Sequence, residues 1–502
     1  MSDMLVQFFV IGLILVISGV LLRQKSRVKL NEPPLVPYKY PIIGHTFEYY
    51  KDVLGFLKKC HEEHGDIFSL YIWGTIQTYV GNENYSEIFK NHHNFDFHEA
   101  LNDTFPIANI LNRPDDYFKD FKKFTKEFLH DLDKYSESVY HKIIKSIDEI
   151  LVEGKVIRPP INTIQQIIAR PIANIIIGVE LCDDKELLNT FVSLTADIGL
   201  WLSIPPALNF IYFNLHRKFI MFKFRYLNNP IKIHRNVILT KITPVINQRI
   251  SDKNNLRDSW KRPIDIMQEL MDKFMVDEKS VDIESVADFI MIFIFSSVHS
   301  TSLTFTQCLF DYVNNHEYHK ELLEEAEKIY DDDKLLLHYT ISKSDKMERL
   351  DHFIKESFRI NRMPVSFPHK TVSSQFTFAN GFQVPKGRVV QIITQQIYYD
   401  QKAFGSDPEK FNPNHHVKSP VTRPERNFIA FGTGKLLCPG RFFAIYEIKV
   451  AMHYILLKYN VKSVSGKHVK PKRIGDYILP SDEGLIFEKK RNDKDFRNIK
   501  CK

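Results

Sequence analysis

Long apolar runs are the most regular feature of the sequence. Residues 5–22 read LVQFFVIGLILVISGVLL, in which Gln7 and Ser18 are the only polar side chains. A helix of that length rises about 27 Å, which is just enough to cross the core of a bilayer. The basic segment RQKSRVK (23–29) follows. This order predicts a membrane anchor with the rest of the chain on the cytosolic side.

A cleaved secretory signal is the alternative for this segment. Such a signal starts with basic residues and ends at a small-residue cleavage site, whereas Asp3 precedes this run and a basic segment follows it. We expect residues 1–25 to form an uncleaved anchor and the basic, proline-rich residues 26–41 to form a stiff hinge. We find no later linker or repeat, so residues 42–502 are predicted to form one large domain.

Beyond the hinge the apolar pattern is mostly helical. The longest apolar run, roughly Ile283 to Val313, predicts a buried helix that is interrupted by small and polar residues. A second apolar helix is predicted at 441–459, directly after Pro439 and Gly440. Short extended segments are expected at 67–73, 76–80, 376–385 and 389–396. The pattern therefore predicts a mainly α fold with a small β region.

Composition agrees with a large helical body. The 502 residues are 44% hydrophobic and 13% aromatic, and only 19 are glycine, which argues against a glycine-rich all-β protein. The net charge of +7 is mild for this length, so we expect no nucleic-acid partner. The five cysteines are odd in number and scattered, which favours a reducing compartment over a disulfide framework or a zinc site.

One cysteine lies in a setting that suits chemistry. Residues 431–444 read FGTGKLLCPGRFFA, so Cys438 directly precedes a predicted helix. Backbone N–H groups and the positive end of a helix dipole stabilise a thiolate at such a place. A thiolate is also the ligand with which haem iron favours cleavage of an O–O bond. The alternative is an inert buried thiol, which a single cysteine in a core usually is.

The segment as a whole resembles the haem-binding loop of the cytochrome P-450 family. The tail CPGRFFAIYEIK is most similar to members that act on sterols, such as sterol 14α-demethylase-like and sterol 7α-hydroxylase-like oxidases. The resemblance implies the cytochrome P-450 fold, with haem b as cofactor and Cys438 as its iron ligand. Leu436 stands where the family usually has a basic residue, so Lys435 is expected to contact a haem propionate instead. The positions that carry the resemblance are Phe431, Gly434, Cys438, Gly440 and Ala444.

A carboxylate and a guanidinium lie upstream of this loop. In HFIKESFRI, Glu356 and Arg359 are three residues apart, so they share one face of a helix and can pair. Alone they would form a surface salt bridge of little value. The segment resembles the Glu-x-x-Arg helix of the same family, which supports the haem-binding core. The resemblance implies that His415 completes this group in place of an arginine, and that His369 contacts a haem propionate.

The helix predicted at 283–313 carries a cluster of small and polar side chains, namely Ser296, Ser297, His299, Ser300 and Thr301. Hydroxyls that bond back to carbonyls one turn earlier are the alternative explanation. The cluster resembles the helix that passes over haem in this family. His299 is then the acid, as in sterol 14α-demethylases and some fungal terpenoid oxidases, and Ser300 is the alcohol that relays protons beside Thr301. The serine side chain is less restricted in its rotamers than that of threonine. We therefore expect the consumption of O2 to be less tightly coupled to the formation of product.

Two further segments are weaker signals. DDYFKDFKKFTKEFL (115–129) lacks the Trp-x-x-x-Arg pattern common in the family. Its FKKFTK run resembles the sterol 14α-demethylase equivalent, which implies that Lys123 contacts a propionate; a solvated lysine is the alternative. The apolar, aromatic and basic residues 201–224 are expected to form the roof of the substrate channel at the bilayer. A plain core helix is the other possibility for them.

The resemblance implies a monooxygenase that inserts one oxygen atom from O2 into a lipophilic substrate such as a sterol, terpenoid or fatty acid. The chain shows no dinucleotide-binding or flavin-binding motif, so electrons are expected to come from a partner. The resemblance implies that this partner is an NADPH-dependent flavoprotein reductase. The expected location is the endoplasmic reticulum membrane, with the catalytic domain (42–502) facing the cytosol. Two alternatives remain: a reductase-independent isomerase that rearranges peroxides, and a non-catalytic haem-binding protein. Residues 99–111 lack features of sterol 14α-demethylases, so that activity is not assigned.

Overall fold

The computed structural model describes residues 30–490, apart from 104–105, 112, 114–116, 130, 132, 203, 228, 333–343 and 362–364. The predicted anchor (1–25) and the start of the hinge lie outside the described residues. The described part of the hinge is attached to the body of the protein. The Val36 N–H donates to the Ser69 carbonyl at 3.0 Å, and the Ser69 N–H donates to the Pro34 carbonyl at 2.8 Å.

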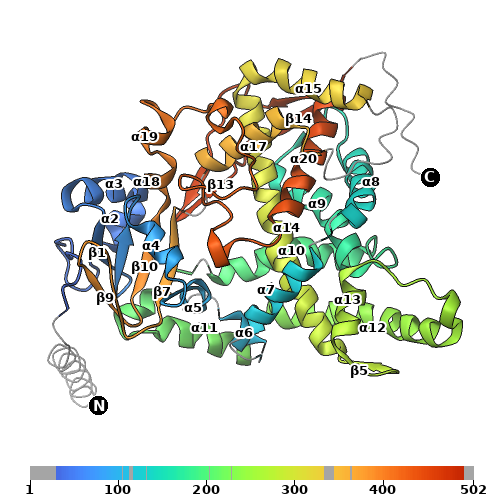
Figure 1. Cartoon of the computed structure of the whole chain (residues 1–502), viewed down its shortest axis with the longest axis horizontal. Coiled ribbons are helices and arrows are strands. Elements are labelled where there is room, and N and C mark those ends of the chain that lie inside the picture. The colour runs from blue at the N-terminus through green and yellow to red at the C-terminus, as the bar shows by residue number, and fades with distance from the viewer. Residues whose placement is uncertain are drawn as a thin grey trace, which may run out of the picture.

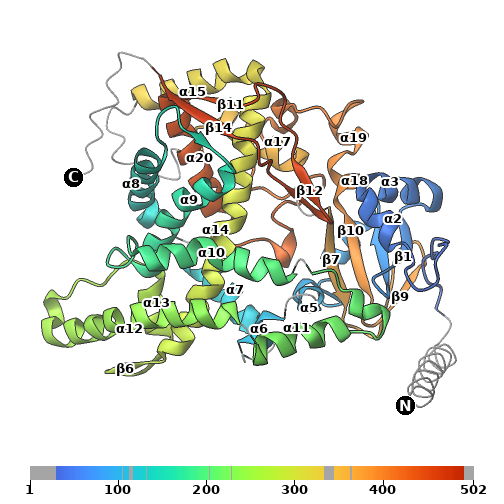
Figure 2. The ribbon, with the colours of Figure 1, turned by 180° about the vertical axis from the view of Figure 1, so that it is seen from behind.

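Helices form most of the molecule, as the sequence predicts. The longest is α14 (Ile283–Asn314), which crosses the middle of the molecule in Figure 1 and in the reverse view of Figure 2. The other α-helices are α2 (Thr46–Lys51), α3 (Val53–His64), α4 (Tyr85–Lys90), α5 (Phe97–Asn102), α6 (Ile107–Ile110), α7 (Tyr117–Phe128), α8 (Asp133–Ile150), α9 (Pro160–Ile177), α10 (Lys185–Leu202), α11 (Leu215–Tyr226), α12 (Pro230–Leu256), α13 (Ile266–Lys273), α15 (His319–Asp332), α17 (Glu348–Ile360), α18 (Thr394–Tyr398), α19 (Gln401–Phe404) and α20 (Arg441–Lys458).

The central helix begins at a side-chain cap. The carboxylate of Asp282 accepts a hydrogen bond from the Ser285 N–H at 3.1 Å, which satisfies one of the free donors of the first turn. Among the described residues, α14 alone is long and apolar enough to span a bilayer, and 72% of its most apolar stretch is buried inside the protein. That degree of burial is typical of a core helix.

The β region is small. Its largest sheet has the strand order β1-β2-β10-β7-β3, in which β2 and β10 are parallel and the other neighbours are antiparallel. This sheet lies to one side of α14 (Figure 1). The remaining strands form short two- and three-stranded sheets. The strands are β1 (Ile67–Ile72), β2 (Thr75–Val80), β3 (Phe95–Asp96), β4 (Val156–Ile157), β5 (Met275–Asp277), β6 (Ser280–Val281), β7 (Ser366–Thr371), β8 (Gln375–Thr377), β9 (Gln383–Pro385), β10 (Val389–Ile393), β11 (Tyr459–Ser463), β12 (Lys472–Ile474), β13 (Tyr477–Leu479) and β14 (Leu485–Lys489).

Two predicted segments differ in detail. The extended segment expected at 376–385 is a hairpin, because β8 and β9 pair antiparallel across the turn that contains Gly381. The segment expected at 389–396 leaves the sheet after Ile393 and continues as α18.

Asp311 on α14 joins that helix to α17. Its Oδ2 accepts hydrogen bonds from Ser357 Oγ at 2.5 Å and from Asn361 Nδ2 at 2.7 Å. Burial raises the pKa of this carboxyl from its usual 3.8 to about 7.

Replacing Asp311 with asparagine should flatten the dependence of the unfolding free energy on pH between about pH 4 and 7. In this window the unfolded chain has lost the Asp311 proton while the folded protein keeps it, so the native state loses stability as pH rises. The contribution of this residue is at most about 4 kcal/mol. Urea unfolding of both proteins across the window measures it, with replacement of the exposed Asp482 as control. Parallel curves for wild type and Asp311→Asn would contradict the assignment.

Candidate functional site

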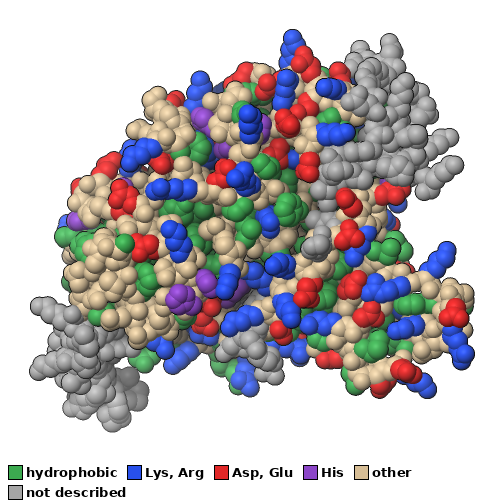
Figure 3. All heavy atoms as spheres, in the orientation of Figure 1, with side chains coloured by type: hydrophobic (Ala, Val, Ile, Leu, Met, Phe, Trp, Pro, Cys, Tyr) green, Lys and Arg blue, Asp and Glu red, His purple; other side chains and the backbone are tan. Residues whose placement is uncertain are grey.

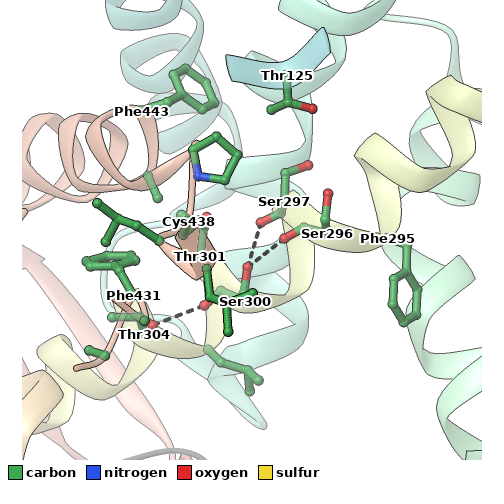
Figure 4. Close-up of a pocket in the computed structure, with 18 of the residues that line it drawn as sticks. Thr125, Phe295, Ser296, Ser297, Ser300, Thr301, Thr304, Phe431, Cys438 and Phe443 are labelled. Atoms are coloured by element: carbon green, nitrogen blue, oxygen red, sulfur yellow. Dashed lines mark hydrogen bonds between the residues drawn. The ribbon is translucent and has the colours of Figure 1, made fainter. Parts of the chain in front are cut away.

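The structure contains a mainly apolar cavity of about 600 Å³. Its walls come from α14, the loop before α20, strand β7, and helices α5, α7 and α17. Figure 4 shows hydroxyl side chains of α14 facing the loop that carries Cys438. Aromatic and aliphatic side chains close the rest of the wall, including Phe97, Leu101, Phe121, Ile292, Phe293 and Phe367.

Cys438 reaches the cavity from a tightly turned loop. Gly432 has a φ of +73°, and a Cβ at this position would lie 2.9 Å from the Leu436 carbonyl, so a side chain does not fit there. The turn is closed by the Cys438 N–H, which donates to the Phe431 carbonyl at 2.8 Å. Phe431, Cys438 and Gly440 all line the cavity. The loop therefore directs one sulfur atom into an otherwise apolar space.

The surroundings of the Cys438 thiol have opposing effects on its pKa. Burial raises the pKa of Cys438, while the backbone N–H groups of Gly440 and Arg441 lower it together with the charges of Arg441 and Lys122. Gly440 lies beside the thiol, and a Cβ at this position would be in ordinary van der Waals contact with the sulfur, at 4.0 Å. Such a thiol is suited to binding a cation or metal that replaces its proton.

Ser300 and Thr301 line the cavity on α14, together with Ser296, Ser297 and Thr304. The Ser300 hydroxyl donates to the Ser296 carbonyl at 2.9 Å, and the Thr304 hydroxyl donates to the Ser300 carbonyl at 3.1 Å (Figure 4). The back-bonding considered as the alternative is thus present. It still leaves the lone pairs of the Ser300 oxygen free to accept a hydrogen bond.

His299 does not line the cavity, unlike Ser297 and Ser300. Its Nδ1 lies 3.1 Å from Nε2 of Gln165 on α9, and burial lowers the pKa of the ring. The predicted acid and alcohol therefore come from adjacent positions of α14 but face different surroundings.

His369 on β7 is fully buried and lines the cavity. Neither ring nitrogen has a hydrogen-bond partner among the residues that the structure describes. Burial lowers its pKa to about 4. A buried polar group without a partner costs free energy, so the cavity wall offers an unused donor here.

The lysine that faces the cavity is Lys122, and it differs from the one expected. Lys123 and Lys435 are exposed and do not line the cavity. Lys122 lines it and donates a hydrogen bond to the Lys435 carbonyl. Gly434, with a φ of +58°, begins the 3-10 turn η6 (Gly434–Leu436) and also lies outside the lining. The lining instead includes Leu436.

Glu356 and Arg359 form a fully buried pair on α17. Arg359 donates from Nε and Nη2 to the two carboxylate oxygens of Glu356, at 2.7 and 2.6 Å. The guanidinium also donates to the carbonyls of Tyr398 and Pro408 at 2.7 and 2.6 Å. The pair therefore joins α17 to two segments that are distant in sequence.

Two histidines complete this group, whereas the resemblance predicted His415 alone. His415 Nδ1 lies 3.3 Å from Glu356, and His416 Nε2 lies closer, at 2.8 Å. Burial alone would raise the pKa of Glu356, but hydrogen bonds from Arg359, His415 and His416 hold it well below its usual range. The adjacent pair His415–His416 was the signal in the sequence that pointed to His416. The sequence alone does not show which of the two rings lies nearer to Glu356.

Comparison with known proteins agrees with this arrangement. A family model described as Cytochrome P450 matches residues 33–486. The Cytochrome P450 monooxygenase AN1598 of Emericella nidulans is 28% identical over 64% of this chain and 59% of the relative, so the match spans about three fifths of that protein. Cytochrome P450 monooxygenase 151 of Postia placenta is 25% identical over 72% of each chain. Cytochrome P450 monooxygenase ptmP of Penicillium ochrochloron is 26% identical over 71% of this chain and 81% of the relative.

The family match covers far more than half of the chain and includes the cysteine loop, the buried Glu356–Arg359 pair and α14. The mainly α architecture with small sheets is the one that the resemblance implied. This chain belongs to the cytochrome P450 family.

Proposed function

We propose that this chain is a haem-thiolate monooxygenase that inserts one oxygen atom from O2 into a lipophilic substrate. One observation carries the proposal: the Cys438 loop and the hydroxyl-bearing segment of α14 line the same apolar cavity. An apolar cavity with a few polar groups is the usual form of a small-molecule site.

Members of this family bind haem b, and the residues of the cavity fit that group. Cys438 would supply the iron ligand, with Phe431 and Gly440 beside it. The ring of His369, whose nitrogens have no hydrogen-bond partner within the described residues, and the ammonium of Lys122 would contact the two propionates, because both are polar groups in an apolar wall. With a thiolate ligand, haem supplies the activation of O2 and the oxidation of a C–H bond.

The polypeptide contributes positioning and proton control. The Ser300 oxygen has lone pairs that can accept a hydrogen bond from water inside the cavity. Its hydroxyl, which donates to the Ser296 carbonyl, would pass a proton on by turning away from that carbonyl and releasing its own hydrogen as it accepts another. The aromatic and aliphatic wall excludes bulk water and holds a lipophilic substrate by burial. A sterol, a terpenoid or a fatty acid would suit such a wall.

We place the electron donor, an NADPH-dependent flavoprotein reductase, at the basic surface near the Cys438 loop. Figure 3 shows Lys and Arg side chains distributed over the face seen in Figure 1. Exposed basic side chains on α7 and around the loop include Lys119, Lys126, Arg423, Arg426 and Lys435. A partner with an acidic docking face would be attracted to them, and salt would weaken the association.

We also place the protein on the endoplasmic reticulum membrane, by residues 5–22 and by a second apolar surface. The segment around η1 (Ala207–Phe210) and α11 exposes large apolar side chains, with Ile211 63% and Tyr226 64% exposed. A patch of this kind at the predicted channel roof suits contact with lipid.

The test combines a spectrum with turnover. The purified full-length chain should bind haem and show the far-red-displaced Soret band of a reduced, carbon-monoxide-bound haem-thiolate protein. Lipophilic compounds should then be screened for a change in haem spin state, and those that bind should be oxidised only when NADPH and reductase are added. A peroxide substrate converted without reductase would favour the isomerase alternative, and absence of the displaced band would reject the proposal.

Replacing Lys122 with methionine is expected to weaken haem retention, whereas Lys123→Met is not. Lys122 lines the cavity and Lys123 is exposed, so only the first loses a charged donor near the propionates. Loss of one charge-assisted hydrogen bond corresponds to about 10- to 100-fold weaker binding. Haem transfer to an acceptor protein measures this directly. Equal retention in the two variants would contradict the role given to Lys122.

A further inference from the structure

Gln165 is a buried polar side chain on a mostly apolar helix. Helix α9 packs beside α14 (Figure 2), and Gln165 is only 6% exposed. Its amide Nε2 lies 3.1 Å from Nδ1 of His299, and within the described part of the chain it is the side-chain partner of that ring. A buried amide costs free energy unless it is hydrogen bonded. The contact with His299 provides a hydrogen bond for the Gln165 amide and, at the same time, a partner for Nδ1 of the imidazole.

The contact also determines where the ring carries its proton. Burial lowers the pKa of His299, and no acidic or basic side chain among the described residues contributes to that change. The ring is therefore neutral at pH 7 and holds one proton on one of its two nitrogens. An amide N–H that faces Nδ1 makes Nδ1 the acceptor, so the proton lies on Nε2.

We propose that Gln165 is a positioning residue for the His299–Ser300 pair: its amide donates to Nδ1 of His299 and holds the ring in the tautomer that carries its proton on Nε2. This rests on the proposed function, because it fixes which nitrogen of His299 carries the proton, directly beside Ser300, whose side chain lines the cavity. The ring itself transfers no proton: Nδ1 is occupied as an acceptor and Nε2 keeps its hydrogen. Protons for oxygen chemistry then come from solvent through water and the Ser300 hydroxyl.

The tautomer can be observed without turnover. In the ferrous carbon-monoxide complex of protein labelled with ¹⁵N-histidine, which is diamagnetic, the two ring nitrogens of His299 give different shifts according to protonation. His299→Gln identifies the signal. We expect an unprotonated Nδ1 and a protonated Nε2 that persist across neutral pH. A proton on Nδ1 would overturn the proposal.

Two substitutions of Gln165 separate positioning from packing. In Gln165→Glu the new carboxylate can only accept, so it favours a proton on Nδ1, and the pKa of His299 should rise by about 1 to 3 pH units. In Gln165→Leu the donor is lost, and product formed per O2 consumed should fall about threefold to tenfold, the range that one neutral hydrogen bond supports.

The matched control is Asn174→Leu. Asn174 lies on the same helix, is 5% exposed, and donates to Ser138 instead of to α14. The Asn174→Leu variant should disturb the packing of α9 without changing the His299 signal or the amount of product formed per O2 consumed. If Asn174→Leu reproduces the effects of Gln165→Leu, or Gln165→Glu leaves the His299 pKa unchanged, the role is merely structural and the proposal fails. Failure of the proposed function is a different result, namely a wild-type protein without the displaced Soret band.

Discussion

Replacing Cys438 with alanine is expected to remove the far-red-displaced Soret band and to reduce monooxygenase turnover to background. Of the four cysteines in the described residues, only Cys438 lines the cavity, so no other sulfur there can take its place. A methyl group cannot bind iron, and the electron donation that favours O–O cleavage is lost with the thiolate. The spectrum of the reduced, carbon-monoxide-bound protein and product formation with reductase measure the two effects.

Cys308→Ala provides the matched control. Cys308 is fully buried on α14, and burial raises the pKa of its thiol to about 12, so it remains protonated. This variant should keep the displaced band and most of the turnover, with a loss of stability typical of a small cavity. An unchanged spectrum in Cys438→Ala, or the loss of the band in Cys308→Ala, would contradict the assignment of the ligand.

The elements around the site follow from local patterns. The helix predicted to end near Val313 ends at Asn314. It continues without a break to that point because its apolar run contains no proline and no strong stop signal. The helix predicted at 441–459 is α20, which starts directly after Pro439 and Gly440. The spacing of Glu356 and Arg359 likewise fixes their pairing, since side chains three apart on a helix are neighbours.

Choices between adjacent residues depend on packing that the local pattern does not contain. Lys122 and Lys123 differ by about 100° around α7, so only the position of that helix against the cavity selects the first. His415 and His416 both reach Glu356 because a 3-10 turn, η5 (Pro413–His416), presents them together. These contacts became apparent only with the tertiary structure.

The partner of His299 is a long-range case of the same kind. Gln165 lies on α9, 134 residues before its partner, and the pair forms because α9 packs beside α14. A single glutamine in an apolar helix is an ordinary feature of a sequence. Its meaning depends on which residue of the neighbouring helix it meets.

Replacing Arg359 with leucine is expected to prevent accumulation of folded, haem-containing protein. The guanidinium and the Glu356 carboxylate are both fully buried. Removing one partner leaves an uncompensated charge inside the protein, which costs about 3–5 kcal/mol. The carbonyls of Tyr398 and Pro408 lose their donor as well. Since domains are stable by only about 5–15 kcal/mol, this cost removes a large share of the stability. Yield of soluble haem protein and its thermal unfolding temperature measure the effect.

The double variant Glu356→Leu/Arg359→Leu tests the cause. With both charges removed, no buried carboxylate is left without a counter-charge, so the loss should be smaller than for Arg359→Leu alone. Recovery should be partial, because the Asn412 N–H and His416 Nε2 lose their acceptor. Arg359→Lys should also fall below wild type, since an ammonium keeps the charge but cannot reach both carboxylate oxygens and two carbonyls at once. If the double variant is less stable than the single one, the guanidinium acts mainly through its backbone contacts and not by neutralising Glu356.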